Sequence, residues 1–222
     1  MISKYIANRL LPLLWIINGV AALAALGYTL IPSAGERQFT RTDAALGRAQ
    51  SYRMVVQKKG NEFNERWLLE VVCPDRQHSR QTDEPANPRW DLRRSVDIEH
   101  IDVGNRSYIK FFKDTEWKAI PFEGIMHCGT VPFLQDGSLF DFKHIRAFGH
   151  IEKKGLDTVA GETCREWVIT FREPDRAPKV FDFCINSDDN LPRRIKTVDG
   201  SFQLILTNWN QLIDIQAPEL SR

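Results

Sequence analysis

The sequence predicts a mainly β protein built around an antiparallel sheet, and three observations support this prediction. From Tyr52 onward, short runs of β-branched and aromatic residues recur at regular spacing, separated by Gly, Asp and Asn. No helical pattern of ten residues lies between these runs, which argues against alternating β-α-β units. Gly104-Asn105 and Asp199-Gly200 lie between apolar runs and suit tight hairpin turns, which need residues that accept positive φ.

The individual elements follow from these patterns in chain order. A short helix is expected over residues 42–49, with Thr42 as its N-cap. The turn Lys59-Gly60-Asn61 separates the first two strands. We predict ten strands in two groups: Tyr52–Gln57, Glu65–Val72, His78–Thr82, Val96–Val103 and Arg106–Phe112, then Gly149–Lys154, Thr163–Phe171, Val180–Ile185, Arg193–Val198 and Phe202–Asn208.

One segment interrupts the strand pattern. The residues from Pro121 to Phe148 are rich in apolar side chains, Phe133 and Phe140 among them, and show no clean period. The segment is too long for an ordinary connection and too apolar to be solvated. We therefore expect it to form a lid of loop and short helix across one face of the sheet.

Composition limits the possible partners. The chain has 222 residues, of which 42% are apolar, so it can build a full hydrophobic core. Lys and Arg number 30 and Asp and Glu number 29, which leaves a formal net charge of +1. Because this balance creates no broad positive field, nucleic acid is not an expected partner.

The first 35 residues differ from the rest. Lys4 and Arg9 precede a run from Leu10 to Ile31 that has no charged side chain and is just long enough to span a bilayer as a helix. The run is either a cleaved signal peptide or an uncleaved anchor, and its length favours the anchor. We therefore divide the chain into residues 1–35, an N-terminal apolar helix with a short linker, and a β domain over residues 36–222.

The cysteines agree with export. Their even number, four, permits two disulfides outside the cytosol. If Thr163–Phe171 and Val180–Ile185 form a symmetric hairpin, Cys164 can lie opposite Cys184. Directly opposed Cβ atoms are roughly 4.5–5.5 Å apart, near the distance that a disulfide needs. We expect this pair to be bonded.

This register has one unfavourable consequence, because it places Glu166 opposite Asp182. It also leaves Cys73 and Cys128 to pair by elimination, which would tie a turn between strands to the lid. Four cysteines allow three connectivities in all, so the second pairing depends on the first.

Alternation along the same hairpin separates an apolar face from a polar face, as a half-buried antiparallel pair requires. We expect the apolar face and the lid to enclose a surface suited to acyl chains. The residues predicted to line it are Trp67, Leu69, Trp167, Ile169, Phe171, Phe181, Phe183, Phe133 and Phe140.

No motif predicts catalysis, and we expect no catalytic residue, metal site or cofactor. The sequence lacks GxSxG, HExxH, a phosphate-binding glycine loop and a dinucleotide fingerprint. His127 and Cys128 are the only candidates for a nucleophile, but neighbours on a strand point to opposite faces. Asp188-Asp189-Asn190 resembles part of a calcium site and is better explained as a polar turn.

Several short motifs resemble those of bacterial proteins built like the periplasmic lipoprotein carrier. The segment from Gly155 to Cys164 is similar to their D-x-V-A-G-x-x-C strand entry, and Asp188–Ile195 to their D-x-x-L-P-x-R turn and strand. Asn208–Pro218 is similar to their terminal strand and I-x-x-P ending, and Ala44–Arg53 to their first helix and strand. Together they indicate a resemblance to the LolA-like superfamily, which includes mycobacterial lipid-binding lipoproteins.

The resemblance implies an open half-barrel, a strongly curved antiparallel sheet whose concave apolar side is covered by helices and holds acyl chains. It implies a non-catalytic domain that binds a lipid or an acylated protein. With the N-terminal helix as an anchor, the domain is expected on the periplasmic side of the inner membrane, or secreted if that segment is cleaved. The alternative function is an accessory subunit that grips a membrane-associated protein partner through the same scaffold.

Overall fold

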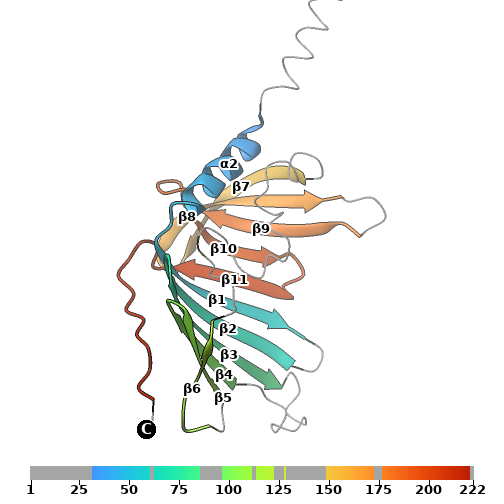
Figure 1. Ribbon diagram of the computed structural model, residues 1–222. Coiled ribbons are helices and arrows are strands. Elements are labelled where there is room, and N and C mark those ends of the chain that lie inside the picture. The colour runs from blue at the N-terminus through green and yellow to red at the C-terminus, as the bar shows by residue number, and fades with distance from the viewer. Residues whose placement is uncertain are drawn as a thin grey trace, which may run out of the picture.

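The computed structural model describes residues 32–60, 63–85, 97–111, 114–122, 128, 149–172 and 177–220. Within these ranges the chain forms one helix and eleven strands (Figure 1). They are α2 (Ala34–Leu46), β1 (Ser51–Lys59), β2 (Phe63–Val72), β3 (Arg76–Pro85), β4 (Asp97–Val103), β5 (Arg106–Phe111), β6 (Lys118–Pro121), β7 (Gly149–Val159), β8 (Glu162–Phe171), β9 (Lys179–Ile185), β10 (Pro192–Thr197) and β11 (Phe202–Thr207).

All eleven strands belong to one antiparallel sheet in the order β6-β5-β4-β3-β2-β1-β11-β10-β9-β8-β7. The sheet therefore consists of two meanders, β1–β6 and β7–β11, joined where β1 pairs with β11. Its two edges, β6 and β7, lie at opposite ends of a curled sheet that does not close (Figure 1). The prediction of a mainly β chain with an open antiparallel sheet is confirmed.

The ten predicted strands correspond to β1–β5 and β7–β11, and β6 was missed. All four residues of β6 are exposed, so the strand has no alternation of apolar and polar side chains that the sequence could reveal. It ends at Pro121, where the predicted lid begins. Apart from Pro121, Phe122 and Cys128, the lid lies outside the described residues, as do Phe133 and Phe140.

The helix begins well before the predicted position. Ser33 is the N-cap of α2: its hydroxyl accepts a hydrogen bond from the Glu36 backbone N–H at 3.1 Å, and the Glu36 carboxylate accepts one from the Ser33 N–H. This capping box satisfies two backbone donors at the start of the helix. Thr42 is therefore not an N-cap but a fully buried residue inside the helix. Ala34 and Gly35, predicted as linker, form its first turn.

Helix α2 packs on the sheet near β7–β9 (Figure 1). The Phe39 ring meets the Phe183 ring edge-on, with centroids 5.2 Å apart. Gly35 lies so close to β7 that a Cβ atom there would be 2.5 Å from Cγ2 of Ile151. The missing side chain of Gly35 thus sets how closely the helix approaches the sheet.

The face of the sheet that α2 covers carries one continuous hydrophobic cluster, and we call it the apolar face. Its buried side chains come from β1, β2 and β8–β11, with α2 and Trp209 packed against them. The opposite face, here the charged face, carries cross-strand ion pairs: Arg53–Glu70, Arg80–Asp97, Arg194–Glu166 and Lys196–Asp182.

The predicted N-terminal apolar helix lies outside the described residues. Among the described residues, no helix has the length and apolar character needed to cross a membrane.

Candidate functional site

The structure brings the predicted lining residues together on the apolar face. Of the nine, seven are described, and all seven belong to the hydrophobic cluster. Trp67 and Phe181 are half-buried at its margin, whereas the other five are buried. Their placement on one face follows from alternation along β2, β8 and β9. Their role in binding a ligand remains a prediction.

The sequence analysis missed the centre of this cluster. Met54 of β1 lies between Leu69 of β2 and Leu206 of β11, and Val56 lies between Trp67 and Leu204. All of these except Trp67 are buried. The signal was present, because β1 and β11 alternate apolar residues at every second position, but only the β1–β11 pairing shows that these strands join the two halves of the cluster.

The apolar face ends abruptly between β2 and β3. Across this border Val71 is paired with Gln77, Leu69 with Ser79 and Trp67 with Gln81. The polar character continues at one end of the next strands, where Gln77 is paired with Asp102, and Asp102 with Ser107. Towards the other end the face is apolar again, since Ile98 is paired with Phe111. We call Gln77, Ser79, His100, Asp102 and Ser107 the polar patch.

Asp102 is the centre of the polar patch and is fully buried. Its Oδ1 accepts a hydrogen bond from the Ser107 hydroxyl at 2.5 Å and lies 3.1 Å from Nε2 of His100. Its Oδ2 accepts a hydrogen bond from Nε2 of Gln77 at 2.7 Å. Burial acts to raise the pKa of Asp102, but His100, Ser107 and Gln77 together outweigh it, so the pKa lies below its ordinary value. The carboxylate is thus charged at neutral pH.

Both predicted disulfides are present, Cys164–Cys184 and Cys73–Cys128. The Cα atoms of the first pair are 5.3 Å apart, and both residues are completely buried. Because Cys128 is bonded to Cys73, it has no thiol to act as a nucleophile, which removes the basis for a His127–Cys128 site. His127 itself lies outside the described residues.

The predicted register of the β8–β9 hairpin is wrong by two residues. Cys184 lies opposite Glu166 rather than Cys164, and Trp167 lies opposite Phe183. A shift of two leaves every side chain on its predicted face, which is why the face assignment holds. The shift also removes the expected repulsion, since Glu166 no longer faces Asp182 and instead pairs with Arg194 at 2.9 Å.

Two of the motifs that carry the resemblance, Gly155–Cys164 and Asp188–Ile195, meet on the charged face. Arg194 of the second motif pairs with Asp157 of the first, at 2.8 Å. Beside them, Val159 and the Cys164–Cys184 disulfide form a small buried cluster. These motif residues therefore hold β7, β8, β9 and β10 together, and they lie away from the apolar face.

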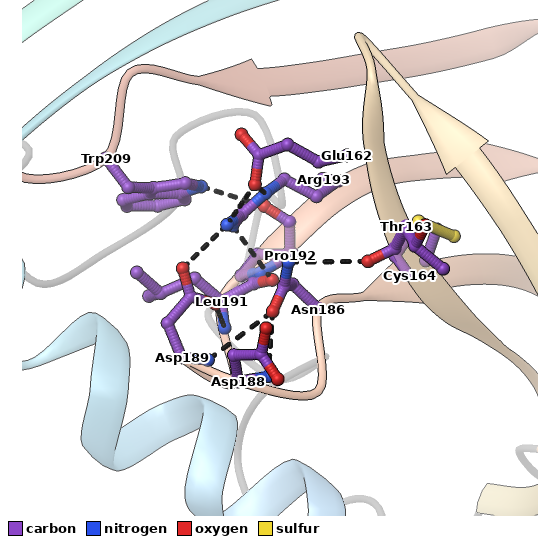
Figure 2. Close-up of polar contacts among 11 residues, drawn as sticks. Glu162, Thr163, Cys164, Asn186, Asp188, Asp189, Leu191, Pro192, Arg193 and Trp209 are labelled. Atoms are coloured by element: carbon purple, nitrogen blue, oxygen red, sulfur yellow. Dashed lines mark hydrogen bonds and ion pairs between the residues drawn. A yellow bond between two sulfur atoms is a disulfide. The ribbon is translucent and has the colours of Figure 1, made fainter.

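Arg193 organises the turn before β10, as Figure 2 shows. Its buried guanidinium donates to Glu162 and to Asp189, each at 2.6 Å, and to the Leu191 carbonyl at 3.2 Å. Nearby, Nε1 of Trp209 donates to the Pro192 carbonyl at 2.9 Å, which fixes the end of β11 over the turn.

The same turn contains Asp188 and Asp189, which the sequence analysis weighed as part of a calcium site or as a polar turn. Oδ1 of Asn186 accepts hydrogen bonds from the backbone N–H groups of Asp188 and Asp189, and Oδ1 of Asp189 accepts one from Leu191. Asp189 is thus occupied by the turn and by Arg193, so the polar-turn interpretation is confirmed. In the described part of the chain, no three His, Cys, Asp or Glu side chains are grouped so that they could hold a metal ion.

The C-terminal segment runs across the strand ends rather than adding a strand. The Asn210 N–H donates to the Ser51 carbonyl at 2.8 Å, and the Arg76 guanidinium donates to the carbonyl of the buried Ile215 at 3.2 Å. A groove of about 620 Å³ lies between this segment and the ends of β1 and β2. Its lining is Gln50, Ser51, Val72, Cys73, Pro74, Asn210, Gln211, Leu212 and Ile213, none of them a predicted lining residue.

No protein-family model and no curated protein sequence matches the chain. Among solved structures, the lipoprotein LppX of Mycobacterium tuberculosis is similar over 82% of this chain and 98% of its own, with a TM-score of 0.53 and 13% identity. LprF of Mycobacterium bovis is similar over 84% and 98%, with a TM-score of 0.55 and 12% identity. The chain therefore shares the fold of these two mycobacterial proteins, as the motif resemblance led us to expect.

Proposed function

We propose that this chain is a non-catalytic, extracytoplasmic domain that binds the acyl chains of a lipid or of an acylated protein on its apolar face. The observation that carries the proposal is the continuous hydrophobic cluster over β1, β2 and β8–β11, with the half-buried Trp67 and Phe181 at its margin. Trp67 and Phe181 are only partly buried at this margin, and acyl chains are chemically suited to cover an apolar surface of this kind. The fold shared with LppX, a lipoprotein, supports the proposal.

The proposed location follows from the disulfides and the N-terminus. Two disulfides form and persist in an oxidising compartment such as the periplasm. The charge-free run up to Ile31 would tether the domain to the outer side of the inner membrane. A tethered domain cannot shuttle between membranes, so lipid handling or sensing at one membrane fits better than free transport.

The test is lipid recovery from the full-length chain purified from membranes. Extraction and mass spectrometry should return about one amphiphile per chain. Phe181→Asp should reduce the amount of amphiphile recovered per chain at least tenfold, because the substitution places a charge at the margin of the cluster. The matched control is Val180→Asp, the adjacent position on the charged face, which should retain the ligand. Intact disulfides in both variants verify folding, and absence of lipid from the wild-type chain would overturn the proposal.

A second candidate function is binding of a protein partner at the β6 edge. The outer side of β6 is unpaired in the described sheet, and Ile120 on this strand is 46% exposed. An exposed edge of this kind can accept an added strand from another chain. Recovery of a stoichiometric protein and no lipid, with a chain lacking residues 1–35, would favour this function.

A further inference from the structure

The polar patch lies beside the hydrophobic cluster on the same face of the sheet. Gln77 is directly opposite Val71, and Val71 is opposite Tyr52. Val71 and Tyr52 are both buried members of the cluster. A molecule whose chains cover the cluster can therefore place a polar end at the border between β2 and β3.

Gln77 has an unused acceptor at this border. The residue is 7% exposed, and its Nε2 donates to Asp102. A carboxylate only accepts hydrogen bonds, so this contact fixes the orientation of the amide and leaves Oε1 facing away from Asp102. Oε1 is buried, and no described residue donates to it. A buried acceptor without a donor is unfavourable, which makes it a candidate for a ligand contact.

Two donors of the polar patch are engaged with Asp102, whereas Nε2 of His100 lies near this carboxylate without a hydrogen bond. The Ser107 hydroxyl and the Gln77 amide both donate to Asp102, and Nε2 of His100 lies 3.1 Å from the same carboxylate. The atom of Gln77 that is buried without a partner is the acceptor Oε1. A complementary ligand group must therefore donate a hydrogen bond, as an ammonium or a hydroxyl does.

We propose that the polar patch is a head-group subsite, in which Oε1 of Gln77 accepts a hydrogen bond from an ammonium or hydroxyl group of the bound amphiphile. The inference rests on the proposed function, because it assigns the polar end of the same ligand. The acyl chains cover the cluster formed by β1, β2 and β8–β11. The head group crosses the border at Val71 and reaches Gln77.

The test compares lipids that differ only in donor capacity, using full-length wild-type protein and native mass spectrometry. Phosphatidylethanolamine and its monomethyl and dimethyl forms keep at least one N–H, whereas phosphatidylcholine has none at the same charge. If the donor is an ammonium group, affinity should fall roughly three- to tenfold between the dimethyl form and phosphatidylcholine, which is the ratio that one hydrogen bond supplies. For a hydroxyl donor, diacylglycerol should exceed its 3-O-methyl ether by the same factor.

The matched variants are Gln77→Leu and Gln81→Leu. Both residues lie on β3 on the same face, but the Gln81 amide donates to Asp83 rather than to Asp102. Gln77→Leu should bring the affinity ratio between the lipids of each pair close to one, whereas Gln81→Leu should keep the wild-type ratio. If Gln77→Leu does not fold, the wild-type lipid series decides alone.

The outcomes separate this inference from the proposed function. Binding of all lipids with no discrimination in either pair overturns the head-group subsite and leaves lipid binding intact. Discrimination that survives Gln77→Leu in a folded protein also overturns it. Binding of no lipid at all overturns the subsite and the proposed function together.

Discussion

Substituting Gly35 by Ala tests how α2 rests on the sheet. The added Cβ would lie 2.5 Å from Cγ2 and 2.8 Å from Cβ of Ile151, well inside ordinary van der Waals contact. The second atom adjoins the backbone of β7, so rotation of the side chain cannot relieve the overlap. Either the helix or the edge strand must move.

The magnitude follows from two opposing effects. Overpacking of this kind costs about 1–3 kcal/mol. Replacing Gly by Ala in a helix returns about 0.5–1 kcal/mol through helix propensity. Gly35→Ala should therefore lower the free energy of unfolding by about 1–2 kcal/mol.

Gly47, the C-cap of the same helix, is the matched control. It has φ of −61°, and a Cβ there would meet nothing closer than 3.6 Å. Gly47→Ala should therefore raise the free energy of unfolding by about 0.4–1 kcal/mol, because Ala restricts the unfolded chain. Urea unfolding followed by tryptophan fluorescence, with the disulfides intact, measures both changes at constant m value. If Gly35→Ala is as stabilising as Gly47→Ala, α2 does not approach β7 as described.

Three further predictions concern the disulfide, one carboxyl group and the buried arginine. Replacing Cys164 and Cys184 together by Ala removes a disulfide that joins residues 20 positions apart. The free energy of unfolding, measured in urea, should fall by about 3 kcal/mol, and the fold should persist. Loss of all β-sheet signal from the double variant would contradict this prediction. Hydrogen bonds, first from the Thr197 hydroxyl, lower the pKa of Asp199 to about 2. The contribution of the ionised Asp199 to stability is therefore present above about pH 4 and lost as the pH falls towards 2. NMR titration of the Asp199 carboxyl group should show the lowered pKa, and Thr197→Val should raise it. Arg193→Met removes the hydrogen-bond donors that bridge the carboxylates of Glu162 and Asp189, and it should lower the free energy of unfolding by about 2 kcal/mol. An unchanged midpoint of urea unfolding would show that the turn is stable without these contacts.

Local signals explain why most of the sheet was predictable. The period of two and the turn residues lie within each hairpin, so ten strands and the two faces of β8–β9 follow from short stretches of sequence. The register of β8 against β9 does not follow from these local signals, because a shift of two residues leaves every side chain on the same face. What distinguishes the two registers is the contact of Glu166 with Arg194 on β10, a strand outside the hairpin.

The polar patch could not be predicted for a related reason. Gln77, His100, Asp102 and Ser107 are polar residues in strands, and such residues normally face solvent. Only the consecutive pairings from β2 to β5 place them on the same face as Val71. The helix start was missed although Ser33 and Glu36 form a recognisable capping box, because it directly follows the apolar run.

The position of β1 between β2 and β11 determines the order in which the domain can assemble during synthesis. The β1–β6 meander can form hairpin by hairpin as it leaves the ribosome or translocon, but β1 then keeps one bare edge until the end of the chain arrives. Gln50 and Asn210, which are hydrogen-bonded in the finished domain, are 160 positions apart. Closing a contact of this separation is slow, and a bare apolar strand edge can pair with the wrong chain while it waits. Truncation before β11 should therefore produce an aggregation-prone half-sheet rather than a smaller stable domain.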